Sequence, residues 1–289
     1  MRFSTRFLVY AAICLLSGMT ASVFAQQPTG ELLYNGIRLP KEWPPRYSIP
    51  SQRETMRVPY LETPPEVIDI NVGRQLFVDD FLIDSTDMKP VCHQARMYEG
   101  NPVLVGDKPW DIAKGVPFAD VYSGGVWFDE HDGKFKVWYR SGEYEVDGRK
   151  VCSSGYAESL DGKHWVKPEL DVFPGTNIID TTAIDNRSVW LDKLEKDPSK
   201  RFKSTSVNTD PARRYKSVFV RTYGDCRYDL KYSADGIHWS DVVAMSDSIQ
   251  DRSTINYNPF RKKWVASLRV VVMTYLRARA YAEDSDLET

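Results

Sequence analysis

Ser159-Leu-Asp161-Gly162-Lys-His164-Trp165 is repeated later in the chain as Ser233-Ala-Asp235-Gly236-Ile-His238-Trp239. A segment that recurs in this way predicts a unit of secondary structure stacked on copies of itself, each copy burying an apolar face of its neighbour. The pattern Ser-x-Asp-Gly-x-x-Trp suits a turn between strands, because Asp caps local backbone amides and Gly accepts positive φ angles. The chain is therefore predicted to be a repeat protein built from β units.

Each unit begins with a short strand, and three copies of this strand are visible in the sequence. They are Val126-Trp127-Phe128-Asp129, Val189-Trp190-Leu191-Asp192 and Ile255-Asn256-Tyr257-Asn258, which start 63 and 66 residues apart. A second strand with alternating apolar residues is predicted at 135–139, 215–219 and 264–268. In the second copy this placement leaves about 17 extra residues after the first strand, which we expect to form a surface excursion.

A third strand is predicted to end at Ser159, Ser233 and Asp284, and the Trp of the repeated turn would open a fourth strand. Four short antiparallel strands in roughly 65 residues are typical of a propeller blade. The predicted fold is therefore all-β, a β-propeller of four-stranded blades. Blade 1 is expected at about 120–170, blade 2 at about 185–243 and blade 3 at about 251–289.

The register of the third copy would place its turn tryptophan at position 290, one residue beyond Thr289. A closed propeller needs at least four blades, and the sequence supplies just under three. We therefore expect these residues to be the N-terminal part of a longer product. A small open β fold is the alternative.

The N-terminus indicates the compartment. Arg2 and Arg6 precede an apolar run from 7 to 16, and small residues near Ala25 offer a cleavage position, as in a secretory signal peptide spanning 1–25. The run is too short to favour a membrane anchor, so we expect a secreted or periplasmic protein with no anchor after cleavage.

Between the signal peptide and the repeats, residues 26–66 are rich in proline and predict an extended arm, and residues 67–289 would form the partial propeller. The apolar segment Arg74–Ile83 is a candidate for a strand that closes the ring. Without a partner strand it would be left as an exposed apolar edge.

Composition excludes several classes of function. The net charge is −2, from 38 Lys and Arg against 40 Asp and Glu, and it becomes −4 once Arg2 and Arg6 leave, which argues against a nucleic-acid partner. Cys92, Cys152 and Cys226 would remain in the mature chain, an odd number that cannot form a disulfide framework. The sequence shows no zinc-type Cys/His spacing and no phosphate-binding glycine loop, so we expect no metal and no cofactor.

Carboxylates are the remaining candidates for chemistry. Asp161 and Asp235 belong to the repeated turn, where capping is expected, and Asp129 and Asp192 end the first strand and are expected to be solvent-exposed turn residues.

The aspartates that precede the first strands are different. Asp185 and Asp251 each lie four residues before the strand, and Asp120 lies six before it, so in extended chain all three would share one face. First strands of propeller blades line the central channel. Three carboxylates crowded there would raise one another's pKa values, as an acid/base pair requires.

Two further kinds of residue accompany these aspartates. Arg187 and Arg252 are candidates for binding substrate oxygens or for pairing with the aspartates. Glu158 and Glu283 share a third-strand position and are reserve candidates for the proton donor.

From Gly73 onward the sequence resembles the five-bladed-propeller glycoside hydrolases, namely the invertase-like family 32, the arabinanase- and xylosidase-like family 43 and the related mannoside phosphorylases of family 130. The stretches that carry the resemblance are Leu76-Phe77-Val78-Asp79-Asp80-Phe81-Leu82-Ile83, Gly100-Asn101-Pro102-Val103-Leu104, Pro109-Trp110-Asp111, Gly133-Lys134-Phe135-Lys136-Val137-Trp138-Tyr139 and the two Ser-x-Asp-Gly-x-x-Trp turns. The resemblance implies a five-bladed propeller and an oligosaccharide or polysaccharide substrate.

By position, the resemblance implies Asp120 as base or nucleophile, Asp185 as the carboxylate that orients the sugar and Asp251 as the general acid. Two departures are visible: Val121 stands where those families have Pro after the first Asp, and Asp251 stands where they have Glu. The function predicted is glycoside hydrolysis by paired carboxylates. The alternative is a non-catalytic propeller that binds carbohydrate or protein, because a fold alone does not decide function. A third possibility is that the truncated chain is inactive, because open blades lose the closing contacts and part of the channel wall.

Overall fold

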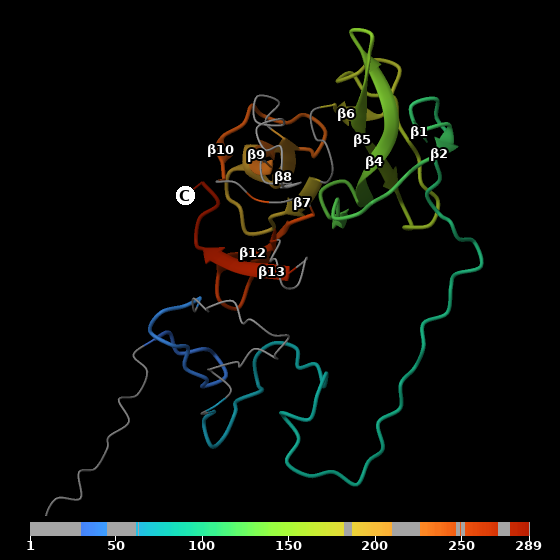
Figure 1. Ribbon diagram of the computed structural model, residues 1–289. Helices are drawn as coiled ribbons and strands as arrows, with labels where there is room; N and C mark the ends of the chain where they lie inside the picture. Colours follow the sequence, from blue (N-terminus) through green and yellow to red (C-terminus); the bar gives the residue numbers. More distant parts are fainter. Residues whose placement is uncertain are drawn as a thin grey trace, which may run out of the picture. The chain divides into compact units, whose positions relative to one another are not determined.

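The computed structural model describes residues 30–44, 62, 64–181, 187–209, 226–246, 249, 252–270 and 278–288. Within these ranges the regular structure is almost entirely antiparallel β-sheet (Figure 1). In the same part of the chain no helix is both long and apolar enough to cross a membrane. The chain divides into two compact units, 1–46 with 56–82 and 47–55 with 83–289.

In the first unit the described part of the arm turns back on itself. Leu32 and Arg38 form an antiparallel bridge, and Ile37 and Leu39 are buried. The apolar segment at 74–83 contains no strand, and its Leu76, Phe77 and Val78 side chains are 70%, 67% and 83% exposed. Strand structure needs a partner for its backbone hydrogen bonds. The ring-closing role of this segment stays a prediction.

The first sheet of the second unit has the predicted four antiparallel strands, in the order in which they occur in the chain. They are β3 (Val126–Asp129), β4 (Lys134–Val146), β5 (Arg149–Ser159) and β6 (Ile178–Asp180). The fourth strand comes later than the sequence suggested. Val166, next to the turn tryptophan, makes only a single bridge to Glu158, and the chain loops out before β6 pairs with β5. A separate hairpin of β1 (Ile112–Ala113) and β2 (Val116–Pro117) precedes this sheet.

The second sheet also has four strands in chain order, but one of them corrects the sequence prediction. They are β7 (Arg187–Leu191), β8 (Phe202–Thr209), β9 (Cys226–Ser233) and β10 (Ala244–Met245), and the 3-10 turn η1 (Pro198–Lys200) precedes β8. The second strand is thus at 202–209 and not at 215–219, a segment that lies outside the described residues. The prediction was wrong because β8 reads Phe-Lys-Ser-Thr-Ser-Val-Asn-Thr, and its buried Ser204, Thr205 and Ser206 interrupt the apolar alternation that marks a strand.

The third sheet contains β11 (Thr254–Asn258), β12 (Lys263–Val270) and β13 (Ala278–Asp284) in the predicted order. The residues after β13 begin the repeated turn once more. Asp284 accepts a hydrogen bond from the Asp286 amide and Asp286 accepts one from the Glu288 amide, as Ser159 and Asp161 do in the first copy.

The two complete copies of the repeated turn share the hydrogen bonds made by their Ser and Asp side chains. In the first, Ser159 Oγ accepts from the Gly162 amide at 2.9 Å, and Asp161 binds the His164 amide at 2.8 Å and its ring at 2.7 Å. In the second copy the corresponding distances are 2.8, 2.9 and 2.7 Å. The turn aspartates and histidines therefore have structural roles, as the sequence indicated.

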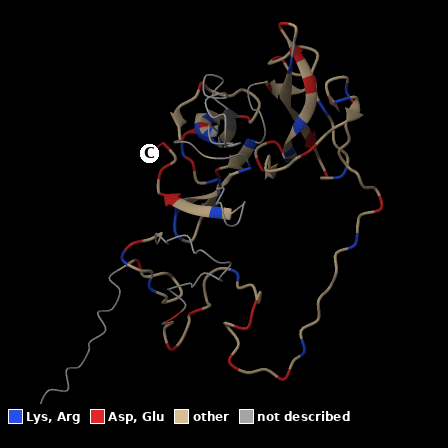
Figure 2. Ribbon diagram, viewed as in Figure 1, with Lys and Arg blue, Asp and Glu red and all other residues tan. Residues whose placement is uncertain are grey.

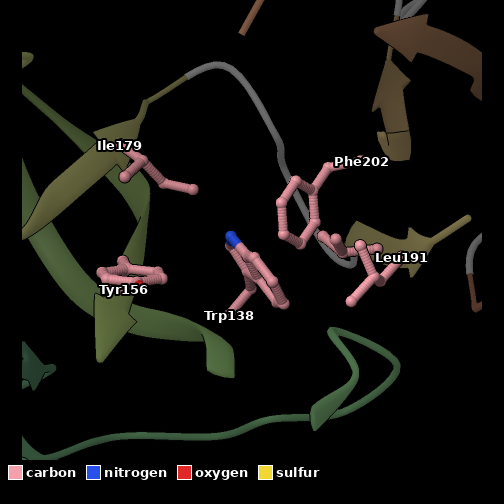
Figure 3. Close-up of a cluster of buried hydrophobic side chains, with 6 residues drawn as sticks. Trp138, Tyr156, Ile179, Leu191 and Phe202 are labelled. Carbon is pink, nitrogen blue, oxygen red and sulfur yellow. The ribbon is translucent and has the colours of Figure 1, made fainter. Parts of the chain in front are cut away.

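The second copy of the turn also joins two sheets. The Trp138 indole N–H of β4 donates to the Gly236 carbonyl at 2.7 Å, and His238 Nε2 lies 2.8 Å from Asp171 Oδ1 in the loop after β5. Around Trp138, residues of both sheets form one buried cluster, shown in Figure 3, whose members are Trp138, Tyr156, Ile179, Val189, Leu191 and Phe202. A second cluster, with Val137 and Tyr139, covers the other face of β4. β4 is thus buried on both faces.

Asp129 corrects a second prediction, because it is 1% exposed and not a solvent-exposed turn residue. Its carboxylate binds Lys136 Nζ at 2.8 Å and, from the connection between β7 and β8, Arg201 Nη2 at 2.6 Å. Burial raises the pKa of the Asp129 carboxyl, but hydrogen bonds from Lys136, the His131 amide and Arg201 outweigh it and hold the pKa below its usual value.

The second sheet repeats this arrangement with Asp192 and Lys203, 3.1 Å apart. In each sheet the lysine has a second carboxylate: Asp132 lies 2.9 Å from Lys136, and Glu195 lies 2.8 Å from Lys203. Acidic and basic residues are interspersed along the strands and their connections (Figure 2). The ends of the first strands are therefore tied to the second strands by ion pairs.

We expect Gly236→Ala to destabilise the protein more than Gly162→Ala. Both glycines have positive φ, 83° and 71°, which costs an alanine about 1 kcal/mol. At Gly236 the added Cβ would also lie 2.5 Å from Cζ2 of buried Trp138, whereas at Gly162 the nearest atom, in Phe135, is 3.8 Å away. Overpacking should add about 1–3 kcal/mol at Gly236. Equal urea midpoints for the two variants would show that the turn does not hold the sheets together.

Asp129→Asn should lower the free energy of unfolding by about 3 kcal/mol, because Arg201 loses this carboxylate and buried Lys136 keeps Asp132 alone of its two carboxylates. Asp192→Asn is the control and should cost less, since it breaks an ion pair with one cation, Lys203, which keeps Glu195.

The pH dependence gives a second measurement. A carboxyl whose pKa is lowered by folding stabilises the protein above its unfolded pKa of about 3.9, and this stability is lost as the pH falls through the folded pKa. The difference between wild type and Asp129→Asn in urea unfolding should therefore be full at pH 6 and shrink below about pH 4. A difference that does not change with pH would contradict the ion-pair assignment.

Candidate active site

The first strands of the three sheets lie next to one another in sequence order. β7 contacts both β3 and β11. Val189 in β7 donates its amide to the Gly124 carbonyl at 3.2 Å and accepts the Trp127 indole N–H at 2.8 Å. Trp190 packs edge-on against Trp127 at 4.7 Å and against Trp264 at 6.0 Å. Three sheets thus meet along their first strands, as blades that share an axis would.

Asp120 lies in the segment that leads into β3. Its backbone forms an antiparallel bridge with Arg140 of β4, through hydrogen bonds of 3.1 and 2.8 Å. Its side chain is half-buried, and Oδ1 accepts the Tyr122 amide at 3.0 Å. The bridge places the residue on the sheet, and the Tyr122 amide orients the carboxylate.

Tyr122 joins this segment to the third sheet. The Arg252 guanidinium, from the segment that leads into β11, lies over the Tyr122 ring at 4.6 Å, and its Nη2 donates to the phenol oxygen at 3.3 Å. Arg279 Nη1 of β13 donates to the Arg252 carbonyl at 2.8 Å. The first and third sheets, which both pack on the second, therefore also meet each other in the segments before β3 and β11.

Of the predicted site residues, the structure brings Arg252 and the Asp120 segment together through Tyr122. Asp185 and Asp251 lie outside the described residues, so the shared face of the three aspartates stays a prediction. Tyr122 was missed by the sequence reasoning. The available signal was an aromatic residue two positions after Asp120 and directly before the Ser123-Gly124-Gly125 turn.

Arg187 lies inside the protein. It is 5% exposed, forms an ion pair with buried Asp180 of β6 and has its guanidinium over the Trp239 ring at 5.5 Å. Burial lowers the pKa of Arg187 to about 10. In this arrangement the guanidinium links the first two sheets.

Glu158 and Glu283 are each paired within their own sheet. Glu158 lies 2.6 Å from Lys134 Nζ, and Glu283 receives Arg261 Nη2 at 2.7 Å. Glu158 lies opposite Lys136 of β4, whereas Asp120 lies opposite Arg140 of the same strand. Lys136 and Arg140 are four residues apart, which corresponds to about 13 Å along the strand. The reserve acid of the first sheet therefore lies away from the end that carries Asp120.

The described ranges contain no group of three or more His, Cys, Asp or Glu side chains arranged to hold a metal ion. Cys92 and Cys152 are free thiols, the first exposed and the second half-buried. The described site offers the Asp120 carboxylate and, from the residue whose amide holds that carboxylate, the Tyr122 phenol with its bound Arg252 guanidinium.

No protein-family model and no curated protein matches the chain. Solved structures similar to part of it include sucrose-6-phosphate hydrolase from Lactobacillus gasseri, with 15% identity, a TM-score of 0.40 and coverage of 59% of this chain and 33% of the other. Fructofuranosidase from Schwanniomyces occidentalis shows 14% identity, a TM-score of 0.36 and coverage of 58% and 34%. A GH43 protein from Bacillus licheniformis shows 15% identity, a TM-score of 0.32 and coverage of 59% of this chain and 30% of the other.

The chain spans about a third of the length of these three structures. They are glycoside hydrolases of the GH32 and GH43 types, and this chain is similar to part of each. The described chain itself is an all-β protein of antiparallel sheets, two of them four-stranded.

Proposed function

We propose that this chain forms the first blades of a secreted or periplasmic five-bladed propeller that hydrolyses glycosidic bonds. One observation carries the proposal: the segments leading into β3 and β11 meet at the contact of Tyr122 with Arg252, and the Tyr122 amide donates to Asp120. In a propeller, residues at the starts of the first strands surround the central channel, so groups distant in sequence reach one mouth.

In the proposed mechanism Asp120 acts as base or nucleophile, Asp185 orients the sugar and Asp251 protonates the leaving oxygen. Glycoside cleavage requires one carboxylic acid at the leaving oxygen and one carboxylate on the opposite face of the ring. The Tyr122 amide supports the role of Asp120, because it holds one carboxylate oxygen and so orients the other. Asp251 directly precedes Arg252 in the sequence, which favours its position near the same mouth.

Asp120→Asn should lower the rate of turnover of aryl glycosides or oligosaccharides at least about 100-fold, the loss typical of removing an acid/base group. The control is Asp147→Asn, at the exposed tip of the β4–β5 hairpin, where Asn tolerates the positive φ of 48° and activity should be unchanged. Urea unfolding should give both variants the stability of the wild type within about 1 kcal/mol.

Turnover that survives Asp120→Asn would contradict the assignment of this carboxylate. Saturable glycan binding by the wild type without any turnover would identify a carbohydrate-binding propeller in place of a hydrolase.

A further inference from the structure

The packing of the second sheet on the third lacks the aromatic residue that fills the space between the first two sheets. Between those two, the Trp138 ring lies 5.9 Å from the Tyr156 ring and 5.6 Å from the Phe202 ring (Figure 3). Its indole N–H also donates to the Gly236 carbonyl. An aromatic side chain of the first sheet thus reaches the turn of the second.

The strand register identifies Thr205 as the counterpart of Trp138 in the second sheet. Trp138 of β4 lies opposite Tyr156, and Thr205 of β8 lies opposite Leu230. Both Tyr156 and Leu230 lie three residues before the serine that begins the repeated turn. In the turn of the third sheet, Leu287 has the place of the glycine. A small hydroxyl side chain therefore replaces a large ring where the second sheet packs on the third.

A pocket of about 130 Å³ lies at this position. Its walls include Thr205, Leu230 of β9, Ile255 of β11 and Leu287, and the exposed Met245 of β10 also lines it. The second and third sheets both contribute to it. An apolar cavity of about 150 Å³ is known to hold a benzene ring. The pocket is thus close to the size that one small aromatic ring requires.

The wall that the third turn contributes is held on the second sheet. The Glu288 carboxylate accepts the Tyr232 phenol O–H at 2.8 Å and lies 3.2 Å from Lys200 Nζ. Because Glu288 directly follows Leu287, these contacts keep the Leu287 side of the pocket close to β9 and η1.

The pocket contains a buried hydroxyl whose bonding capacity is unused. Thr205 is 5% exposed, and its Oγ1 forms no hydrogen bond within the part of the chain that the structure describes. A buried polar group without a partner costs free energy, and a hydroxyl can both donate and accept. Ligand sites typically combine apolar walls with a few polar groups that orient the ligand. Thr205 supplies such a group among Leu230, Ile255 and Leu287.

We propose that this pocket binds a small planar aromatic molecule that carries a hydroxyl or a ring N–H, of the class of phenol and indole. The ring takes the place that the Trp138 indole has between the first two sheets, and its polar group bonds to the Thr205 hydroxyl. The ligand then ties the second sheet to the third. The inference does not depend on the proposed function, because no candidate catalytic residue lines the pocket.

The test is a calorimetric titration of the whole chain with phenol, indole, toluene and cyclohexanol. Phenol and indole should saturate with dissociation constants of about 1 mM or below, and cyclohexanol should bind about 10-fold more weakly because its ring is not planar. Thr205→Val keeps the shape but removes the hydroxyl, so it should weaken phenol binding about 3- to 10-fold and leave toluene binding unchanged.

Thr205→Trp places an indole in the pocket and should abolish the binding of every probe. It should also raise the urea midpoint, as cavity filling does. Indole should raise the urea midpoint of the wild type by mass action and leave that of Thr205→Trp unchanged. The matched control is Thr86→Trp, the same substitution at an exposed threonine, which should leave all affinities as they are.

Four results would overturn the proposal. They are no saturable binding of phenol or indole up to about 10 mM, binding that survives in folded Thr205→Trp, an equal loss of phenol and toluene upon Thr205→Val, and cyclohexanol binding as tight as that of phenol. If Thr205→Trp does not fold, the comparison of phenol with toluene in Thr205→Val decides.

Discussion

The packing of each sheet on the next is the constraint on which this structure depends. The first sheet carries large apolar side chains on both faces of β4, so neither face can remain in water at low cost. The joint with the second sheet includes a buried hydrogen bond from the Trp138 indole to the Gly236 carbonyl, at a turn where an added Cβ would lie 2.5 Å from Trp138. The same turn sequence follows the third strand of both four-stranded sheets, so each of these sheets carries the turn that such a contact with a neighbouring sheet uses.

The two ends of the first strands differ in the residues that they carry. At the end where β3 finishes, Asp129 gathers cations from two sheets, and a similar ion pair, between Asp192 and Lys203, lies at the end of β7. Before the start of β3 the chain instead has half-buried Asp120 and the exposed Tyr122, whose ring contacts the exposed Arg252 guanidinium. Buried ion pairs with several partners favour a unique arrangement of sheets.

The proposed function is based on this difference between the two ends of the first strands. A site assembled from the starts of several first strands can hold groups that are more than 100 residues apart in sequence, as Tyr122 and Arg252 are. The sheets behind it are tied together by aromatic contacts and ion pairs, which keep such groups at fixed positions. Precise placement of catalytic groups is what the proposed cleavage of a glycosidic bond would require.

The sequence by itself determined the β units, because alternation and turn chemistry are local: the strands near Val126, Val189 and Ile255 and the turns at Gly162 and Gly236 could be read directly. It misplaced the second strand of the second sheet, since the polar side chains of β8 are buried and carry no apolar pattern.

Only the tertiary structure decided the environments of the charged residues. Asp129 looked like an exposed turn residue and Arg187 like a substrate ligand, yet both are buried against another sheet. The same holds for the site. The sequence identified Asp120 and Arg252 as candidate residues, but it did not identify Tyr122. The burial and partners of a charge depend on segments brought close by packing, and sequence spacing does not record that proximity.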